Sequence, residues 1–206
     1  MKLKDSLEKF PFIGIMRGIR PTEAVAFAKA LVDKSFRIIE TPLNSPDPLS
    51  SIKFMAESYG DIALIGAGTV TEVEQVKQVQ KAGGSLIVSP NCDPEVIRAT
   101  KNCGLLSIPG VATPTEAIAA VKAGADALKL FPSEIISPGA VKAILAILPP
   151  ETLLIPVGGI NASNWQPYLQ AGARGFGLGS SLYKKGMSLE LLADNAEQFR
   201  QTWLDK

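Results

Sequence analysis

The chain has 206 residues, of which 46% are hydrophobic and 20% are charged, and its formal net charge is +1. This near-neutral balance excludes the strong electrostatic attraction that nucleic acids or acidic membranes require, so we expect neither as a partner. The sequence contains no histidine, which excludes imidazole metal sites and histidine-based triads.

The length and the even composition predict one domain over residues 1–206. Residues 1–9 are charged and amphipathic and lack the apolar centre of a secretion signal, so we expect a cytoplasmic protein. Cys92 and Cys103 lack the spacing of a zinc site or a disulfide framework. We expect them to serve packing, and we expect neither a metal nor a cofactor.

In chain order, a first helix is followed by eight repeats of a strand and a helix. The apolar segments predict strands at 10–18, 36–43, 62–70, 86–90, 105–111, 127–132, 153–158 and 176–180. The intervening segments predict helices at 21–34, 46–59, 72–82, 94–102, 114–123, 138–148, 163–171 and from about 189. Eight apolar strands alternating with helices predict an α/β fold, a (β/α)8 TIM barrel with an extra N-terminal helix.

Proline and glycine mark the ends of these helices. Proline stands near the first turn at Pro21, Pro94, Pro114 and Pro138, where its missing N–H is harmless. Glycine follows an alanine or a cysteine at Gly83, Gly104, Gly124 and Gly172, as expected of left-handed helix caps.

Lys129 lies in a short apolar stretch, Ala127-Leu128-Lys129-Leu130-Phe131-Pro132. Burial of an ammonium group is costly and lowers its pKa, which makes the neutral amine available as a nucleophile. Lys129 is therefore a candidate to form a Schiff base. The alternative is a structural lysine that reaches water or an ion pair at the strand end.

Other polar residues lie at the ends of predicted strands, where barrel enzymes carry their functional groups: Arg17, Glu40, Thr69 and Asn91. We expect all of them at one mouth. Strand alternation points Glu40 and Lys129 inward, as a catalytic pair or as a structural salt bridge. Arg17 is either a clamp for a substrate anion or an ordinary rim charge. Thr69 either contacts substrate or caps the next helix.

The last two strands are followed by glycine-rich loops, Pro156-Val157-Gly158-Gly159-Ile160-Asn161 and Gly177-Leu178-Gly179-Ser180-Ser181. Bare backbone N–H groups, with a short helix after the eighth strand, would favour an anion. After strands seven and eight of a barrel, this pattern predicts a phosphate handle.

An ordered series of short motifs along nearly the whole chain resembles the class I 2-keto-3-deoxy-6-phosphosugar-acid aldolases. The motifs are Glu40-Thr41-Pro42-Leu43-Asn44-Ser45, Ile65-Gly66-Ala67-Gly68-Thr69-Val70, Ile87-Val88-Ser89-Pro90-Asn91, Ile108-Pro109-Gly110-Val111-Ala112-Thr113, Leu128-Lys129-Leu130-Phe131-Pro132 and Val157-Gly158-Gly159-Ile160. The resemblance implies metal-independent cleavage of a phosphorylated keto-deoxy sugar acid to pyruvate and glyceraldehyde 3-phosphate. It also implies a homotrimer.

The resemblance also implies roles for residues. Lys129 would form the Schiff base and Glu40 would move protons. The substrate-binding residues would be Arg17, Thr69, Pro90 and Phe131, with Gly158, Gly159, Gly179 and Ser180 at the phosphate.

One departure distinguishes two subfamilies. Gluconate-type (KDPG) members carry an arginine four residues after the glutamate, whereas this chain has Asn44 there and Arg17 at the end of the first strand. That combination resembles the 2-dehydro-3-deoxy-6-phosphogalactonate (KDPGal) aldolases. The alternatives are the C4-epimeric gluconate substrate, or a phosphate-binding barrel with an isomerase or sensor role.

Overall fold

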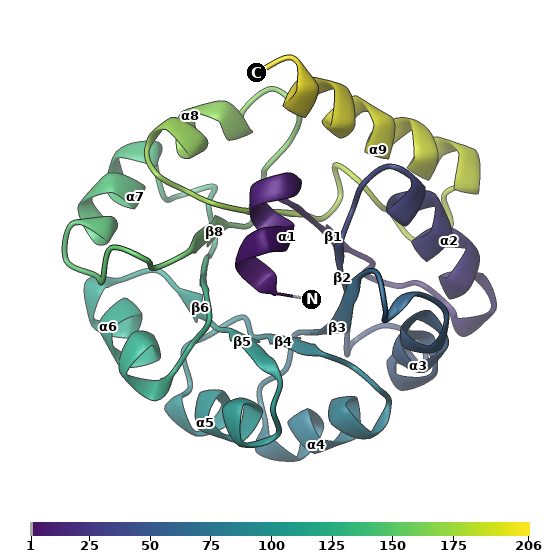
Figure 1. The fold of residues 1–206 in the computed structure, drawn as a ribbon, viewed down its shortest axis with the longest axis horizontal. Coiled ribbons are helices and arrows are strands. Elements are labelled where there is room, and N and C mark those ends of the chain that lie inside the picture. The colour runs from purple at the N-terminus through teal and green to yellow at the C-terminus, as the bar shows by residue number, and fades with distance from the viewer. Residues whose placement is uncertain (1) are drawn as a thin grey trace.

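The computed structural model describes residues 2–206. Helices and strands alternate along almost the whole chain (Figure 1). The elements are α1 (Leu3–Lys9), β1 (Phe12–Ile15), α2 (Pro21–Asp33), β2 (Ile38–Pro42), α3 (Pro48–Tyr59), β3 (Leu64–Gly68), α4 (Val73–Lys81), β4 (Leu86–Val88), α5 (Pro94–Asn102), β5 (Leu106–Ile108), β6 (Gly110–Val111), α6 (Pro114–Ala123), β7 (Leu128–Leu130), α7 (Pro138–Leu145), β8 (Leu154–Pro156), α8 (Trp165–Gln170), β9 (Phe176–Leu178) and α9 (Leu189–Leu204). The predicted α/β class is therefore confirmed.

The strands form two parallel sheets. Six strands make a curled sheet in the order β5-β4-β3-β2-β1-β9, and three make a second sheet in the order β6-β7-β8. An isolated parallel bridge between Val157 and Gly177 joins the end of β8 to β9. Figure 1 shows the strands facing a common centre, with helices α2 to α9 around the outside.

The fifth predicted strand, 105–111, is divided in the structure into β5 and β6. Pro109 lies at the break and has no N–H to donate, so the ladder cannot continue through it. Its carbonyl still accepts a hydrogen bond from Lys129 N at 2.9 Å. The chain thus passes from the first sheet into the second at this proline.

The helix boundaries follow the proline and glycine signals. The four prolines expected near helix starts occupy the first turns of α2, α5, α6 and α7. The four glycines expected after helices all have φ between +74° and +109°, a region that side chains disfavour and glycine tolerates. The predicted helix ends are therefore confirmed to within a few residues.

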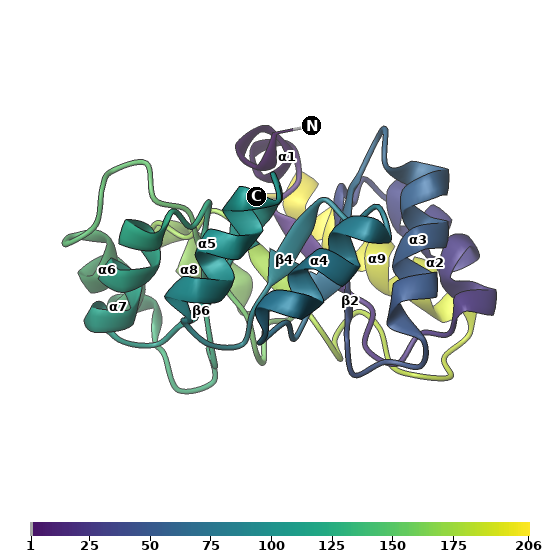
Figure 2. The same cartoon turned by 90° about the horizontal axis from the view of Figure 1, so that it is seen from below.

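Two apolar clusters hold the elements together. The larger one lies between the strands and the outer helices, and the partly buried thiols Cys92 and Cys103 pack against it as expected. The smaller one fills the space inside the strands and includes Leu3 and Leu7 of α1. Figure 2 shows α1 projecting on one side of the strands, so this helix covers one end of the inner cluster. No helix among residues 2–206 has the length and apolar character needed to cross a membrane.

Candidate active site

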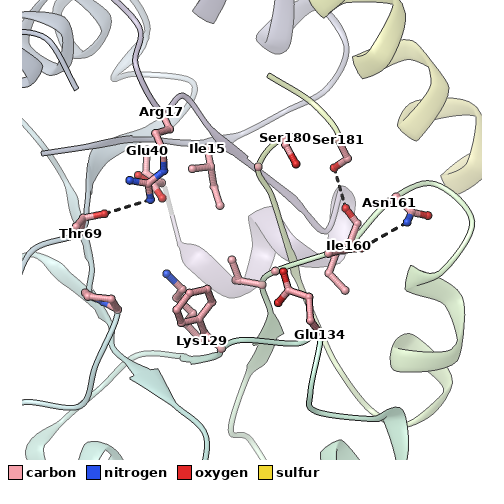
Figure 3. Close-up of a pocket in the computed structure, with 16 residues that line it drawn as sticks. Ile15, Arg17, Glu40, Thr69, Lys129, Glu134, Ile160, Asn161, Ser180 and Ser181 are labelled. Atoms are coloured by element: carbon pink, nitrogen blue, oxygen red, sulfur yellow. Dashed lines mark hydrogen bonds between the residues drawn. The ribbon is translucent and has the colours of Figure 1, made fainter. Parts of the chain in front are cut away.

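A pocket of about 440 Å³ opens inside the strands, among the loops that follow them (Figure 3). Parallel strands bring their carboxyl ends to the same edge, which is why residues far apart in the sequence meet there. The lining residues are Ile15, Arg17, Glu40, Thr69, Pro90, Lys129, Phe131, Glu134, Val157, Gly158, Gly159, Ile160, Asn161, Gly179, Ser180 and Ser181. Every residue to which the family resemblance gives a role is among them.

Lys129 is the middle residue of β7 and its side chain is only 7% exposed. Its neighbours Leu128 and Leu130 belong to the outer apolar cluster, whereas Ala127 belongs to the inner one. Alternation along the strand therefore turns Lys129 inward. Its Nζ lies 4.5 Å from the centre of the Phe131 ring. Burial lowers the pKa of Lys129 below its ordinary value of 10.5, partly opposed by the Glu40 carboxylate.

Glu40 lies on β2 and is 3% exposed. Its carboxyl group packs against Gly68 on the neighbouring strand so closely that a Cβ there would overlap it. Burial raises the pKa of Glu40 from 4.5 to about 7, although Lys129 and then Arg17 act in the opposite direction. Over the described residues, Oε2 of Glu40 has no hydrogen-bond partner.

Lys129 and Glu40 line the same pocket without forming an ion pair. No salt bridge within 4.0 Å joins them in the part of the chain that the structure describes. The alternative of a structural Lys129–Glu40 salt bridge is therefore not what the structure contains. An amine with a lowered pKa faces a shared cavity with a carboxyl group whose pKa is close to neutrality, an arrangement typical of nucleophilic and acid–base chemistry.

Arg17 follows β1 and is fixed by two side chains from neighbouring strand ends. Its Nη1 donates to Asn44 Oδ1 at 2.6 Å and its Nη2 donates to Thr69 Oγ1 at 3.4 Å. Thr69 has a left-handed backbone, with φ of +58°. The helix that follows it, α4, has Glu72 at its N-cap, so Thr69 does not cap that helix. The guanidinium is thus held at the pocket rather than free on the rim.

The far end of the pocket is formed by the loops after β8 and β9. Gly158 and Gly159 have φ of +105° and +66°, which glycine adopts without strain. Ser181 Oγ donates to the carbonyl of Ile160 at 2.7 Å and so ties the two loops together. The short helix expected after the last strand is absent from the described residues, where Gly179 only begins a turn. It is a single turn, in which the N–H groups of Leu182 and Tyr183 both donate to Gly179 O at 2.9 Å.

One expected residue does not line the pocket, and several lining residues were not expected. Asn91 lies outside the pocket, where its backbone carbonyl accepts a hydrogen bond from Gly110 N–H at 3.2 Å, and the preceding residue, Pro90, lines the pocket. Sequence reasoning missed Glu134, and it placed Asn161 and Ser181 in the two glycine-rich loops without giving either a role. Glu134 offered one signal, since it follows Pro132 in the loop after the strand of Lys129. Among residues 2–206, no three His, Cys, Asp or Glu side chains gather as a metal site.

The comparisons with known proteins identify the family. The family model described as KDPG and KHG aldolase matches residues 3–196. The 2-dehydro-3-deoxy-6-phosphogalactonate aldolase of Escherichia coli (strain K12) is 47% identical over 191 residues, which cover 93% of each chain.

Two solved structures have the same fold. One is described as "Native KDPGal structure", with a TM-score of 0.93, 45% identity and 96% coverage of each chain. The other is a cube-shaped protein cage designed by fusing symmetric oligomeric domains, with a TM-score of 0.93 and 45% identity over 96% of this chain and 73% of that chain. The family model and these relatives cover nearly the whole sequence, and the chain belongs to the KDPG and KHG aldolase family.

Proposed function

We propose that this protein is a class I aldolase that cleaves 2-dehydro-3-deoxy-6-phospho-D-galactonate to pyruvate and D-glyceraldehyde 3-phosphate. The observation that carries the proposal is that Lys129 and Glu40 line one pocket without forming a salt bridge. The lysine pKa is lowered and the glutamate pKa is raised to about 7. An amine whose pKa is lowered by burial and an acid that titrates near neutrality are the two groups that Schiff-base cleavage needs.

In the proposed reaction, neutral Lys129 attacks the C2 ketone, and loss of water gives an iminium. The Glu40 carboxylate takes the proton of the C4 hydroxyl, the C3–C4 bond breaks, and its electron pair moves into the iminium to form an enamine. Glyceraldehyde 3-phosphate leaves. The Glu40 carboxyl then protonates C3, and hydrolysis of the new iminium releases pyruvate and restores the amine.

The remaining pocket residues hold the two ends of the substrate. Arg17, fixed by Asn44 and Thr69, binds the C1 carboxylate through its planar guanidinium. Pro90 and Phe131 pack around the pyruvyl part, on the side of Lys129. At the other end, Gly158 and Gly159, together with Gly179 and Ser180, receive the phosphate on backbone N–H groups and a hydroxyl.

The galactonate-derived substrate is supported by the Arg17–Asn44 pair and by the name of the E. coli relative. Pyruvate release coupled to lactate dehydrogenase, with the galactonate- and gluconate-derived substrates measured side by side, tests this choice. We expect a higher kcat/KM for the galactonate epimer. A preference for the other epimer would reassign the substrate, and no pyruvate from either would favour an isomerase or a sensor.

The assembly and the closure of the strands form part of the proposal. The Val157–Gly177 bridge and the passage of the chain through Pro109 support one closed (β/α)8 barrel in a single domain over 1–206. Relatedness to a cage component built from symmetric oligomeric domains supports an oligomer, which we propose to be a homotrimer. Sedimentation equilibrium tests this through the mass in solution. We also propose that the protein is located in the cytoplasm.

A further inference from the structure

Four charged residues line the pocket, and the proposed function uses three of them: Arg17, Glu40 and Lys129. The fourth is Glu134. Figure 3 shows its side chain reaching into the pocket from the loop after β7, on the side of Ile160 and Asn161 and away from Arg17. Its carboxylate therefore lies at the end of the pocket that the proposed function gives to the phosphate.

The backbone that carries Glu134 is firmly held. Ser133, next to it in the chain, is buried, its N–H donates to Val157 O at 2.9 Å, and its hydroxyl donates to Leu130 O at 2.9 Å. The Tyr168 hydroxyl lies 3.1 Å from Ser133 O and 2.9 Å from Ile136 O, on either side of Glu134. The loop thus directs Glu134 toward β8 by contacts that do not involve its side chain.

The Glu134 side chain packs directly on the two glycines. A Cβ at Gly158 would overlap Oε2 and would stand 2.9 Å from Cδ of Glu134, and a Cβ at Gly159 would stand 3.0 Å from its Cγ. The carboxylate therefore occupies the space above the glycine backbone. A phosphate bound to the N–H groups of that backbone would therefore lie close to the carboxylate.

No cation neutralises this carboxylate. Over residues 2–206, Glu134 takes part in no salt bridge and accepts no side-chain or backbone hydrogen bond. Of the pocket's own cations, Arg17 lies across the cavity from Glu134 (Figure 3), and neither Arg17 nor Lys129 forms a salt bridge with it in the described part of the chain. The carboxylate therefore places a negative charge beside a dianionic phosphate, and like charges repel.

We propose that Glu134 is a specificity-determining residue that weakens anion binding at Gly158–Gly159 by placing an unneutralised carboxylate beside the bound phosphate, so that the phosphorylated product leaves readily. This inference rests on the proposed function for the place of the phosphate. It assigns to Glu134 no contact with the reacting atoms.

Inorganic phosphate is the probe, and its Kd is measured by isothermal titration calorimetry. We expect Glu134→Gln, which keeps the shape and removes the charge, to lower the Kd about three- to tenfold at low ionic strength, the size expected for one charge close to an anion in a solvent-exposed site. The gain should shrink at high salt. The control is Glu151→Gln, which removes the same charge at an exposed position outside the pocket and should leave the Kd unchanged.

Further variants distinguish the effect of the Glu134 charge from the effect of its side-chain size. A measurement without phosphate tests the proposed function separately. Glu134→Asp keeps the charge and should stay close to wild type, whereas Glu134→Ala should bind phosphate at least as tightly as Glu134→Gln. Trapping of pyruvate, which carries no phosphate, should proceed at the same rate in every Glu134 variant.

An unchanged or raised phosphate Kd in Glu134→Gln would overturn the assignment of Glu134. If kcat/KM for cleavage fell at the same time, the carboxylate would instead serve the sugar hydroxyls. Failure of pyruvate trapping in the wild type would overturn the proposed function, whatever the phosphate result. Gain of measurable phosphate binding only in Glu134→Gln would support the proposal, and no binding in either protein would overturn it.

Discussion

Replacing Glu40 by glutamine should abolish cleavage and raise the free energy of unfolding at neutral and alkaline pH. Burial raises the pKa of Glu40 from 4.5 to about 7, so the folded protein binds this proton more tightly than the unfolded chain does. The contribution of Glu40 to the free energy of unfolding is therefore fully present below pH 4.5 and is lost as the pH rises to about 7. At 1.36 kcal/mol per pKa unit, the loss is about 3 kcal/mol.

Glutamine resembles the protonated carboxyl in shape and does not ionise, so Glu40→Gln should not lose this free energy. We would measure urea unfolding of both proteins from pH 5 to pH 8 at one protein concentration. The difference in unfolding free energy between them should move in favour of Glu40→Gln by about 2.5 kcal/mol over that range, because a smaller part of the loss has already occurred at pH 5. Any constant offset from the new amide cancels, because only the change with pH is compared.

Lys129 supplies an internal check. In its protonated form, Lys129 lowers the pKa of Glu40. The pH-dependent difference in unfolding free energy between proteins with and without the Glu40→Gln substitution should therefore widen when both also carry Lys129→Met. Glu151→Gln, at an exposed site outside the pocket, serves as the control for loss of one carboxylate. A gap that stays constant with pH, or one that moves in favour of the wild type, would refute the view that Glu40 is held in a desolvated site.

Three further predictions concern activity and local stability. The kcat/KM for cleavage should rise with pH through about 7, as Glu40 becomes a base, and Glu40→Gln should lack this rise. Asn44→Ala removes the partner of the Arg17 guanidinium; KM should rise roughly tenfold with a smaller change in kcat, and an unchanged KM would remove Asn44 from the binding of substrate. Thr113→Ala breaks the capping box of α6 and should lower the unfolding free energy by about 1 kcal/mol without affecting kcat/KM.

The order of strands and helices could be predicted because local chemistry sets it. Prolines at first turns and glycines in left-handed caps act through their own backbone, so the sequence carries the signal directly. The inward direction of Lys129 followed from alternation along one strand, for the same reason. Pro109 shows the limit of such reasoning, since a missing N–H matters only where a neighbouring strand needs it.

Contacts between distant residues could not be predicted in this way. Arg17 and Asn44 are 27 positions apart and meet because β1 and β2 pair in register, with Ile15 opposite Glu40. Glu134 lines the pocket and Asn91 does not, because of how their loops turn after each strand. The pKa of Glu40 depends on desolvation by the surrounding strands, which the sequence does not state. These features depend on tertiary structure and leave no local pattern in the sequence.

Reduction with borohydride in the presence of pyruvate tests the central claim most directly. Peptide mapping by mass spectrometry should find one reduced pyruvyl adduct, on Lys129, and Lys129→Met should acquire none while remaining folded. An adduct on a different lysine, or substrate cleavage by Lys129→Met at the wild-type rate, would contradict the account of an inward, neutral amine as the nucleophile.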